Sequence, residues 1–402
     1  MSEPALQSEP VVEHVTPAAV TAYGREFWYV FVASCALNTV SNLFVLFPLY
    51  VVDLGGGPGA IGAIVGTGSA FALFARPGVG PAIDRWGRRS TAMWFMLFDV
   101  FAVALYLTIH SLGWPIYAVR AVHGAIEGTA RVALFAMVYD LLPEGREGEG
   151  MSLFSLCGMG PAAIAPALGE ILVKRAGFTA FFYAAVLMLI AGAYVTSLIP
   201  EKHQGLKHGD EIAPRQYAAL VKNRELMTLW AITLLFALSI SARFSFVAPL
   251  AYQKGITRVG GYFAIYSIAA VVQRVFGGRI MDRIGLERMI APSMFVMGIG
   301  LAMIAGTGHM GMLSWAALIG GLGHGYLYPA LSALVIARTP ASAMGRSSTL
   351  YTSLYDFGAM AGPYAFGVMG GYLGYGPIFI ASGLIAIAGS AVFLASEPRS
   401  RS

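Results

Sequence analysis

Gly80-Pro-Ala-Ile-Asp84-Arg85-Trp-Gly87-Arg88-Arg89 returns 198 residues later, in shortened form, as Gly278-Arg-Ile-Met-Asp282-Arg283-Ile-Gly285. An arginine precedes each aspartate by eight positions, at Arg76 and at Arg274. A Gly-x3-Asp-Arg-x-Gly pattern that repeats at about half the chain length indicates that the chain consists of two related halves. Because each copy lies between two long apolar segments, it is predicted to be a short polar hairpin that joins two transmembrane helices.

The composition of the chain is that of a membrane protein. Hydrophobic residues make up 57% of its 402 residues and charged residues only 12%, and the mean hydropathy is +0.68. A soluble domain carries about twice that share of charge. The net charge of +5 is spread over loops, which argues against nucleic acid as a partner. Two lone cysteines in apolar runs, Cys35 and Cys157, predict neither a disulfide framework nor a metal site, and no motif indicates a cofactor.

Twelve apolar runs are long enough, at about 20 residues, to cross the hydrocarbon core of a bilayer. The longest interruption, 200–225, is strongly charged and separates six runs from six. We therefore predict an all-α polytopic membrane protein made of two pseudo-symmetric six-helix bundles. The twelve predicted spans are 27–51, 60–83, 91–111, 115–140, 149–173, 177–199, 226–251, 259–281, 288–307, 311–337, 346–371 and 376–396.

The predicted domains follow from these spans and from the distribution of charge. Residues 1–24 are polar and lack the basic start of a secretory signal, so they are predicted to be a disordered tail. Lys and Arg accumulate on the loops that lie on the same side as this tail, which predicts that both termini are cytoplasmic. The expected parts are the tail 1–24, a bundle at 25–199, a cytoplasmic linker at 200–225, a bundle at 226–396 and a tail at 397–402.

The repeat extends beyond the hairpin, since Pro48 returns as Pro249 and His123 as His324, at offsets between 197 and 201. With the hairpin signature, these features resemble the major facilitator superfamily over nearly the whole chain. The resemblance implies a central cavity between the bundles, a small-molecule substrate, a monomer, and a place in the bacterial inner membrane. It also implies that the hairpin locks one face of an alternating-access cycle; the alternative is that it only anchors the topology. The gating residues implied are Gly80, Asp84, Arg85, Gly87 and Arg88, with Asp282 and Arg283 in the second copy.

The fourth span carries four ionisable residues at spacings of three, four and four, which places them on one face of a helix. Charged side chains inside a membrane are expensive, so this face is predicted to turn inward. The segment resembles a span-4 motif of proton-coupled family members, which implies that Glu127, Arg120 and His123 couple transport to protons. The alternative is a permanent pair between Glu127 and Arg131 that only holds the helix in place.

The fifth span reads Gly158-Met-Gly160-Pro161-Ala-Ala-Ile-Ala165-Pro166-Ala-Leu-Gly169-Glu170. It resembles a Gly-Pro-x-x-Gly-Gly motif of family exporters, especially drug/proton antiporters, with Ala165 and Glu170 in place of two glycines. Its prolines are expected to leave backbone carbonyls unbonded and to bend the helix. Glu170 lies close to Lys174 near the outer end of the span, and we expect these two to form a surface pair.

The family resemblance places spans 1, 4, 7 and 10 around the cavity. Arg243 on span 7 occupies the position of Asn42 on span 1 at an offset of 201. Fixed positive charge exceeds negative charge among these residues, which favours an anionic or amphipathic solute. Asp356 is expected to neutralise Arg243 or Arg274, and Asp99 to neutralise Arg76. The predicted substrate-binding residues are Arg131, Arg243, Asn38, Asn42, His324 and Tyr328.

Two transport functions are consistent with these residues. The first is proton-coupled efflux of a small amphipathic or anionic compound, and the alternative is proton-coupled uptake of an organic anion. An enzyme is disfavoured because the sequence lacks a His-Glu-x-x-His or a nucleophile–base signature. A nucleotide-driven pump is disfavoured because no Gly-x4-Gly-Lys-Ser/Thr loop is present.

Overall fold

The structure is a computed structural model, and it describes residues 23–143, 146–201, 214–340 and 343–396. Within these ranges every regular element is a helix. The tails 1–22 and 397–402 and the linker segment 202–213 lie outside the described residues. The helices are α1 (Arg25–Leu43), η2 (Phe44–Leu46), α2 (Phe47–Asp53), α3 (Pro58–Trp86), α4 (Arg88–Leu105), η3 (Tyr106–Thr108), α5 (Trp114–Tyr139), α6 (Glu147–Ser197), α7 (Pro214–Val221), α8 (Arg224–Gln253), α9 (Val259–Ile284), α10 (Leu286–Ala305), α11 (Met310–His324), α12 (Leu327–Ala337), α13 (Met344–Leu373) and α14 (Tyr375–Ser396).

Each of the twelve predicted spans coincides with helix to within about three residues at either end. Within the described residues, nine helical segments are long and apolar enough to cross a membrane. One of them, in α6, contains two predicted spans, which meet where Gly177 leaves helical geometry with φ 73°. Two further helices, α9 and α13, have 26 and 30 residues and complete the twelve segments.

Positive-φ glycines mark the helix junctions and reveal the internal repeat. Left-handed φ values occur at Gly55 and Gly255, at Gly87 and Gly285, and at Gly177 and Gly374. The members of each pair lie about 200 positions apart, as expected for two copies of one unit. A glycine adopts this conformation without steric penalty, so the turns of both halves are built in the same way.

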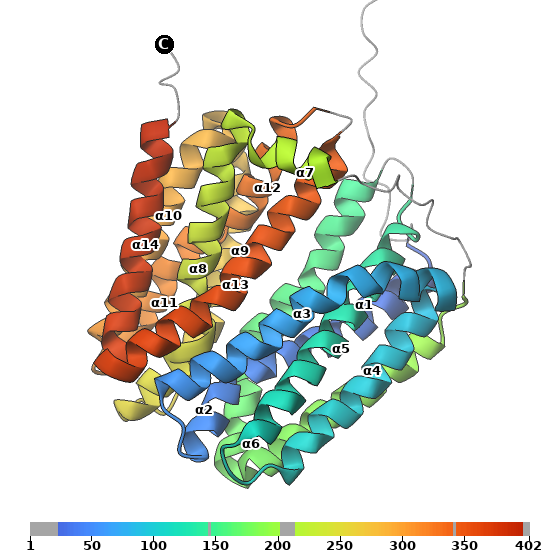
Figure 1. The fold of residues 1–402 in the computed structure, drawn as a ribbon, viewed down its shortest axis with the longest axis vertical. Helices are drawn as coiled ribbons and strands as arrows, with labels where there is room; N and C mark the ends of the chain where they lie inside the picture. The colour runs from blue at the N-terminus through green and yellow to red at the C-terminus, as the bar shows by residue number, and fades with distance from the viewer. Residues whose placement is uncertain (1–22, 144–145, 202–213, 341–342, 397–402) are drawn as a thin grey trace, which may run out of the picture.

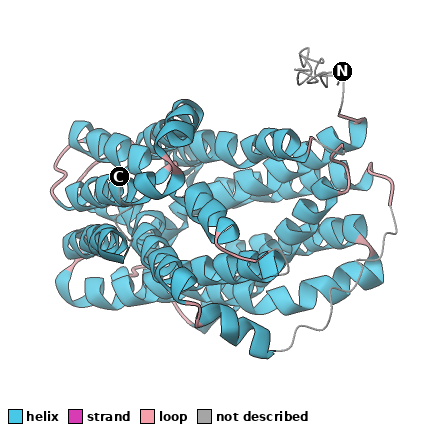
Figure 2. Ribbon diagram, turned by 90° about the horizontal axis from the view of Figure 1, so that it is seen from above, coloured by secondary structure: helices cyan, strands magenta, loops and turns pink. Residues whose placement is uncertain are grey.

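The helices form two sets that lie side by side, α1–α6 in blue to green and α8–α14 in yellow to red (Figure 1). Within the first set α1 packs on α6, and α5 packs on both α3 and α4; within the second set α8 packs on α13, and α10 packs on both α11 and α14. The sets meet mainly where α3 packs along α13 and α6 packs along α9. Seen from above, the described chain consists of helices joined by short loops (Figure 2), and helices satisfy their backbone hydrogen bonds internally, as a bilayer requires.

Two faces of the molecule are named here by the helix ends that they carry. The terminal face carries the start of α1 and the ends of α3, α5 and α14, and in Figure 1 it runs from the C-terminal label and α7 at the top to the right-hand side. The distal face carries the turns at Gly55, Gly113, Gly177, Gly255 and Gly374.

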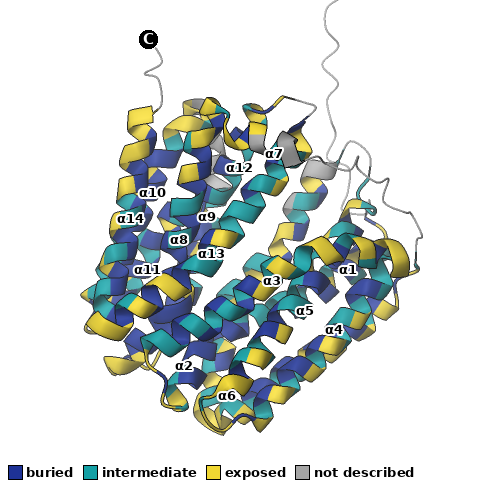
Figure 3. Ribbon diagram, viewed as in Figure 1, coloured by how far each residue is buried: buried dark blue, intermediate teal, exposed yellow. Residues whose placement is uncertain are grey.

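Buried residues lie between the helices, and exposed residues lie on the outward surfaces and at the helix ends (Figure 3). Large apolar side chains are nevertheless exposed along outward helix faces, for example Trp94, Phe98 and Phe101 on α4. A soluble protein seldom exposes such a continuous apolar surface, whereas lipid tails solvate it. The chain is therefore a multi-pass membrane protein.

One predicted span is interrupted by a turn, whereas the first span continues from α1 through the 3-10 helix η2 into α2. The segment 311–337 was expected to be a single helix, but α11 ends at His324 and α12 begins at Leu327. The physical reason is Pro329, which has no N–H to donate to the carbonyl of Gly325 four residues earlier. That free carbonyl instead accepts a hydrogen bond from Arg274 Nε at 3.1 Å, which ties α9 to the break.

Candidate functional site

Four cavities of about 210, 190, 180 and 170 Å³ lie along the central helices, and neighbouring cavities share lining residues. The arginine cavity contains Arg243, Arg274 and His324, and it shares Val45 and Phe244 with the next one. The second cavity, called the glutamate cavity, contains Glu127 and Arg120. The third contains Arg76, Arg131 and Asp356, and the fourth contains Asn38 and Arg131.

Glu127 faces the glutamate cavity from α5 and is bonded on several sides. Its carboxylate forms an ion pair with Arg131 one helical turn away, and it accepts a hydrogen bond from Ser41 on α1. Arg131 also donates to Ser41 Oγ at 2.8 Å and to Asn38 Oδ1 at 3.1 Å. The pair of Glu127 and Arg131 that was considered as the alternative to a coupling role is thus present, and it is part of a network that joins α5 to α1.

His123 lies behind Glu127 and is fully buried. Its Nε2 lies 3.6 Å from Asp99 Oδ1 and 3.8 Å from Glu127 Oε2. Its Nδ1 lies 3.3 Å from Arg120 Nη1 and 3.3 Å from the hydroxyl of Tyr106. Because a guanidinium can only donate, Nδ1 is the acceptor and Nε2 carries the hydrogen of a neutral ring. The single N–H of His123 therefore points toward two carboxyl groups.

Asp99 on α4 was assigned by sequence reasoning to Arg76, and that assignment is wrong. Asp99 is fully buried beside His123, and neither of its oxygens has a hydrogen-bond partner within the described residues. Asp356 was likewise expected to neutralise Arg243 or Arg274, but it pairs with Arg76 instead. That ion pair joins α3 of the first set to α13 of the second.

Arg243 lies on α8 and is only 5% exposed. Its guanidinium carbon lies 4.0 Å from the ring centre of Phe244 and 4.1 Å from that of Tyr266, at distances typical of a cation–π contact. Within the described part of the chain, Arg243 has no carboxylate partner, and its buried Nε has no hydrogen-bond acceptor.

The remaining predicted substrate residues differ in how close they lie to the cavities. Asn42 and His324 line the arginine cavity, and Asn38 lines the fourth. Tyr328 is absent from the lining of all four cavities. Its ring packs at 5.1 Å against Tyr355, which does line the glutamate cavity, so Tyr328 stands behind the wall.

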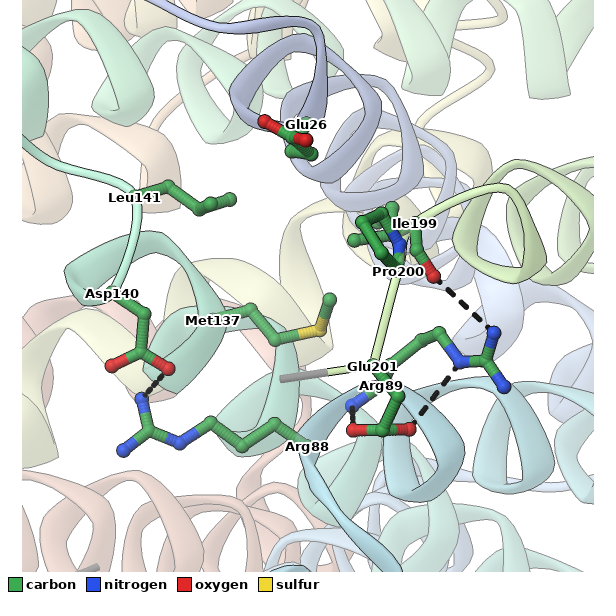
Figure 4. Close-up of a pocket in the computed structure, with 9 residues that line it drawn as sticks. All are labelled: Glu26, Arg88, Arg89, Met137, Asp140, Leu141, Ile199, Pro200 and Glu201. Atoms are coloured by element: carbon green, nitrogen blue, oxygen red, sulfur yellow. Dashed lines mark hydrogen bonds and ion pairs between the residues drawn. The ribbon is translucent and has the colours of Figure 1, made fainter. Parts of the chain in front are cut away.

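The polar hairpin lies at the terminal face and is bonded within its own set of helices (Figure 4). Arg88 forms an ion pair with Asp140, which directly follows α5. The carboxylate of Glu201, the first acid after α6, accepts the backbone N–H groups of Arg89 at 3.2 Å and Ser90 at 3.0 Å. This places a negative charge at the N-terminus of α4, where the helix dipole favours it. Gly87, with φ 82°, leaves room for that carboxylate, because an added Cβ would lie 2.6 Å from Glu201 Cδ.

The other hairpin residues make fewer contacts. Asp84 and Arg85 are exposed and form no hydrogen bond or ion pair within the described residues. A Cβ added at Gly80 would meet nothing within 4 Å, so packing does not require glycine there in this conformation. Asp282 and Arg283 fall in α9, but their side chains lie outside the part that the structure describes.

The two sets of helices are joined toward the distal face. Glu170 forms the expected pair with Lys174, and both also reach the second set, at the N–H of Gly260 and the carbonyl of Thr257. Ser267 on α9 donates to the carbonyl of Ala162 at 3.1 Å. That carbonyl is the one left free by Pro166, so the expected unbonded carbonyl of the fifth span is used between the sets.

Sequence reasoning missed several of these residues. Ser41 and Ser267 carried no motif, Arg274 was not predicted to line a cavity, and Asp99 was given another partner. Arg274 had one signal, since it repeats Arg76 at the hairpin's offset, but its neighbours could not be read from the chain. No cluster of three His, Cys, Asp or Glu side chains suited to a metal ion occurs in the ranges that the structure describes.

The model of the Major Facilitator Superfamily matches residues 29–310 and 258–402 of this chain. The chain belongs to that superfamily. It is therefore a transporter of small molecules and not an enzyme, and the predicted family and fold class are confirmed.

Curated relatives at low identity span most of the chain. The staphylopine export protein of Staphylococcus aureus is 21% identical over 360 residues, which cover 87% of this chain and 90% of that protein. The multidrug resistance protein MdtG of Dickeya zeae is 24% identical over 329 residues, 79% of each chain. The multi-drug resistance efflux pump PmrA of Streptococcus pneumoniae is 21% identical over 358 residues, 86% of this chain and 89% of the pump.

Among solved structures, the nucleoside transporter NupG superposes with a TM-score of 0.78, at 12% identity, over 93% of this chain and 99% of NupG. The human organic anion transporter MFSD10 superposes with a TM-score of 0.67, at 15% identity, over 92% of this chain and 100% of MFSD10. At these identities the likeness concerns the fold alone.

Proposed function

We propose that this protein exports a small amphipathic or anionic solute across the bacterial inner membrane by alternating access, coupled to the entry of protons. The direction is supported by relatives that carry the names of export and efflux proteins. The protein functions as a monomer with both termini in the cytoplasm, so the terminal face is the cytoplasmic one. The partners are the solute, protons and the surrounding lipid.

The observation that carries the proton coupling is the position of Glu127. Its side chain is 15% exposed, lines a cavity, and bonds to Arg131 and Ser41, while the N–H of His123 is close by. A proton on Glu127 weakens its attraction to Arg131, and loss of that proton restores it. Arg131 also holds Asn38 on α1, so the protonation state of Glu127 is linked to the packing of two cavity helices.

Alternating access is supported by the distribution of contacts between the two sets. Hydrogen bonds join them toward the distal face, as at Gly260 and Ser267, and the pair of Arg76 and Asp356 joins them near the middle, whereas Asp84 and Arg85 are exposed at the terminal face. We propose that the two sets move as bodies. When the terminal face closes, Asp84 and Arg85 contact the second set, in charge-assisted bonds that are released when it opens.

Inverted membrane vesicles test direction and coupling together. Acidifying the vesicle interior reproduces the inward-directed proton gradient of the cell, and substrate is then expected to accumulate inside the vesicles. Dissipating the gradient with a protonophore is expected to abolish accumulation. Accumulation that survives the protonophore would contradict proton coupling. Substrates for this assay come from comparing metabolites released by deletion and overexpression cells.

A cysteine-accessibility assay tests the gate. Asp84→Asn removes the charge that is proposed to hold the terminal face closed, so a reporter cysteine in the cavity is expected to be labelled faster from the cytoplasmic side. Asp53→Asn, an exposed aspartate at the distal end of α2, is the matched control. Equal labelling rates in the wild type and both variants would count against the gate.

The second candidate function is uptake of an organic anion by the same fold. Its supporting observation is the lack of a carboxylate partner for Arg243 within the described residues. The vesicle assay separates the candidates, because a proton-coupled importer would expel substrate from acid-loaded inverted vesicles, whereas an antiporter would accumulate it.

A further inference from the structure

The arginine cavity holds two guanidinium groups and no carboxylate among its lining residues. Arg243 reaches it from α8 and Arg274 from α9, and His324 on α11 lies in the same lining. Arginine stays protonated in proteins, so this cavity carries two positive charges at any working pH. Charge of one sign buried without compensation is unfavourable, which indicates that the compensating charge belongs to a bound ligand.

The way Arg243 is held leaves its hydrogen-bonding edge free. The rings of Phe244 and Tyr266 lie 4.0 and 4.1 Å from its guanidinium carbon. Ring contacts of this kind engage the π faces of a guanidinium, while all five N–H donors lie in its plane. Its Nε has no acceptor, and its terminal nitrogens have no ion pair with a carboxylate among the described residues, so its donors are unused there.

Arg274 is positioned by the backbone rather than by an acid. Its Nε donates to the carbonyl of Gly325 at 3.1 Å, and its Nη1 lies 3.7 Å from the sulfur of Met159 on α6. A thioether is a weak acceptor, so the terminal N–H groups of Arg274 retain most of their capacity. The cavity therefore offers one clamped guanidinium edge and a second guanidinium whose far end is available.

The rest of the wall is apolar and partly aromatic. Phe244, Phe263 and Tyr266 line it together with Val45 and Ala270. A carboxylate binds arginine through two parallel hydrogen bonds, and flat apolar groups pack well against aromatic rings.

We infer that the arginine cavity binds organic anions in which a carboxylate is attached to a flat apolar body. Arg243 receives the carboxylate edge-on, Arg274 supplies the second positive charge, and the aromatic wall holds the body. This inference rests on the proposed transport function and narrows its substrate class. It disfavours organic cations, because two fixed positive charges repel them.

Binding of 2-naphthoate to the purified protein, measured by isothermal titration calorimetry without any gradient, tests the inference. The neutral 2-naphthamide and the cationic 2-naphthylmethylamine have the same ring system and serve as matched probes. The carboxylate is expected to bind at least about tenfold more tightly than the amide, and the amine not measurably. Equal affinity for naphthoate and naphthamide would overturn the inference.

Substitutions of the two arginines test whether naphthoate binds in the arginine cavity. Arg243→Gln and Arg274→Gln are each expected to weaken naphthoate binding by about tenfold or more while leaving naphthamide binding unchanged. Arg243→Lys keeps the positive charge but cannot form two parallel hydrogen bonds with a carboxylate. Its affinity for naphthoate is expected to lie between those of the wild type and Arg243→Gln. Arg175→Gln, an exposed arginine of α6 at the distal face, is the control with wild-type affinity. Unchanged naphthoate affinity in both glutamine variants would show that the anion binds elsewhere.

Two further measurements distinguish loss of the anion site from loss of the fold and from failure of the proposed proton coupling. A thermal melt and a gel-filtration profile of each variant separate loss of the site from loss of fold, and Arg243→Lys provides a second folded variant. Because the calorimetry needs no proton gradient, naphthoate binding without gradient-driven transport would refute the proposed coupling and leave the anion site standing. Gradient-driven transport of compounds that are not anions, without naphthoate binding, would refute the anion site and leave the coupling standing.

Discussion

His123 and His324 occupy equivalent positions in the two halves, yet only His123 has carboxyl groups beside it. His123 lies 3.6 Å from Asp99 and 3.8 Å from Glu127. His324 packs between the rings of Phe236 and Tyr266 at 5.7 and 5.6 Å, in a cavity that contains two arginines. One scaffold thus holds a mixed site of carboxyl groups and arginines in the first half, and a site with arginines alone in the second. This division suits a carrier that binds protons on one side of its cavity and an anion on the other.

The repeat shows where the difference arose. At the offset of 201 that relates the two histidines, Glu127 corresponds to Tyr328, and at the hairpin's offset of 198 Asp99 corresponds to Met297. The second half therefore lacks both acids. The backbone differs as well, because α5 runs on past Gly124, whereas α11 ends at His324.

The largest effect is expected from Glu127→Gln, which removes the titrating group of the first-half site. Gradient-driven transport in vesicles should fall to background, while exchange of labelled for unlabelled substrate without a gradient remains measurable. Glu225→Gln, an exposed glutamate at the start of α8, is the control and should transport normally. Full active transport by Glu127→Gln would show that Glu127 does not bind the coupling proton, and the proposed functional difference between the two histidine sites would be lost.

A smaller effect is expected from Asp99→Asn. Asparagine keeps an acceptor oxygen but carries no negative charge, so the N–H of His123 favours Glu127, and a neighbouring site of negative charge is lost. Both changes favour the ionised form of Glu127, so more acid is needed to protonate it, and the pH profile of transport should shift by about one unit toward acid. Asp53→Asn should leave the profile unchanged. A shift toward alkaline pH, or none, would exclude Asp99 from the proton site.

Pro329→Ala tests whether the break between α11 and α12 positions Arg274 in the arginine cavity. Alanine supplies an N–H that can bond to the carbonyl of Gly325, and so competes with Arg274 for that acceptor. We expect naphthoate affinity to fall by about three- to tenfold, as one hydrogen bond that orients Arg274 is lost. Pro292→Ala on α10, a helix whose residues do not line the arginine cavity, is the comparison variant. An unchanged affinity in Pro329→Ala would mean that the break in the helix does not position Arg274.

The smallest effect is expected from Asp356→Asn. Because Asp356 pairs with Arg76 rather than with Arg243, its removal should leave naphthoate affinity within about twofold of wild type. The pair is partly exposed, so its contribution to the contact between α3 and α13 is expected to be modest as well. A large gain in anion affinity would show that Asp356 competes for the second-half arginines, and that the two sites are less separate than the structure indicates.

The sequence by itself determined the architecture. Hydropathy fixes which segments can cross a bilayer, and six glycines with left-handed φ reverse the chain at matching points in both halves. The one break that went unnoticed, at Gly325, follows from Pro329, which is a local signal present in the sequence. Helical spacing likewise predicted the pair of Glu127 and Arg131, because residues four apart share a helix face.

Only the tertiary structure decided which charges meet across helices. Asp99 lies beside His123 and not Arg76, and Asp356 lies beside Arg76 and not Arg243. Ion pairing depends on distances of a few ångströms between helices, which are set by how small residues such as Gly62 and Gly367 let the backbones of α3 and α13 approach. Spacing along one chain carries no measure of those distances. The sequence therefore supplied the ionisable groups, and packing distributed them into a mixed acid–arginine site and a site with arginines alone.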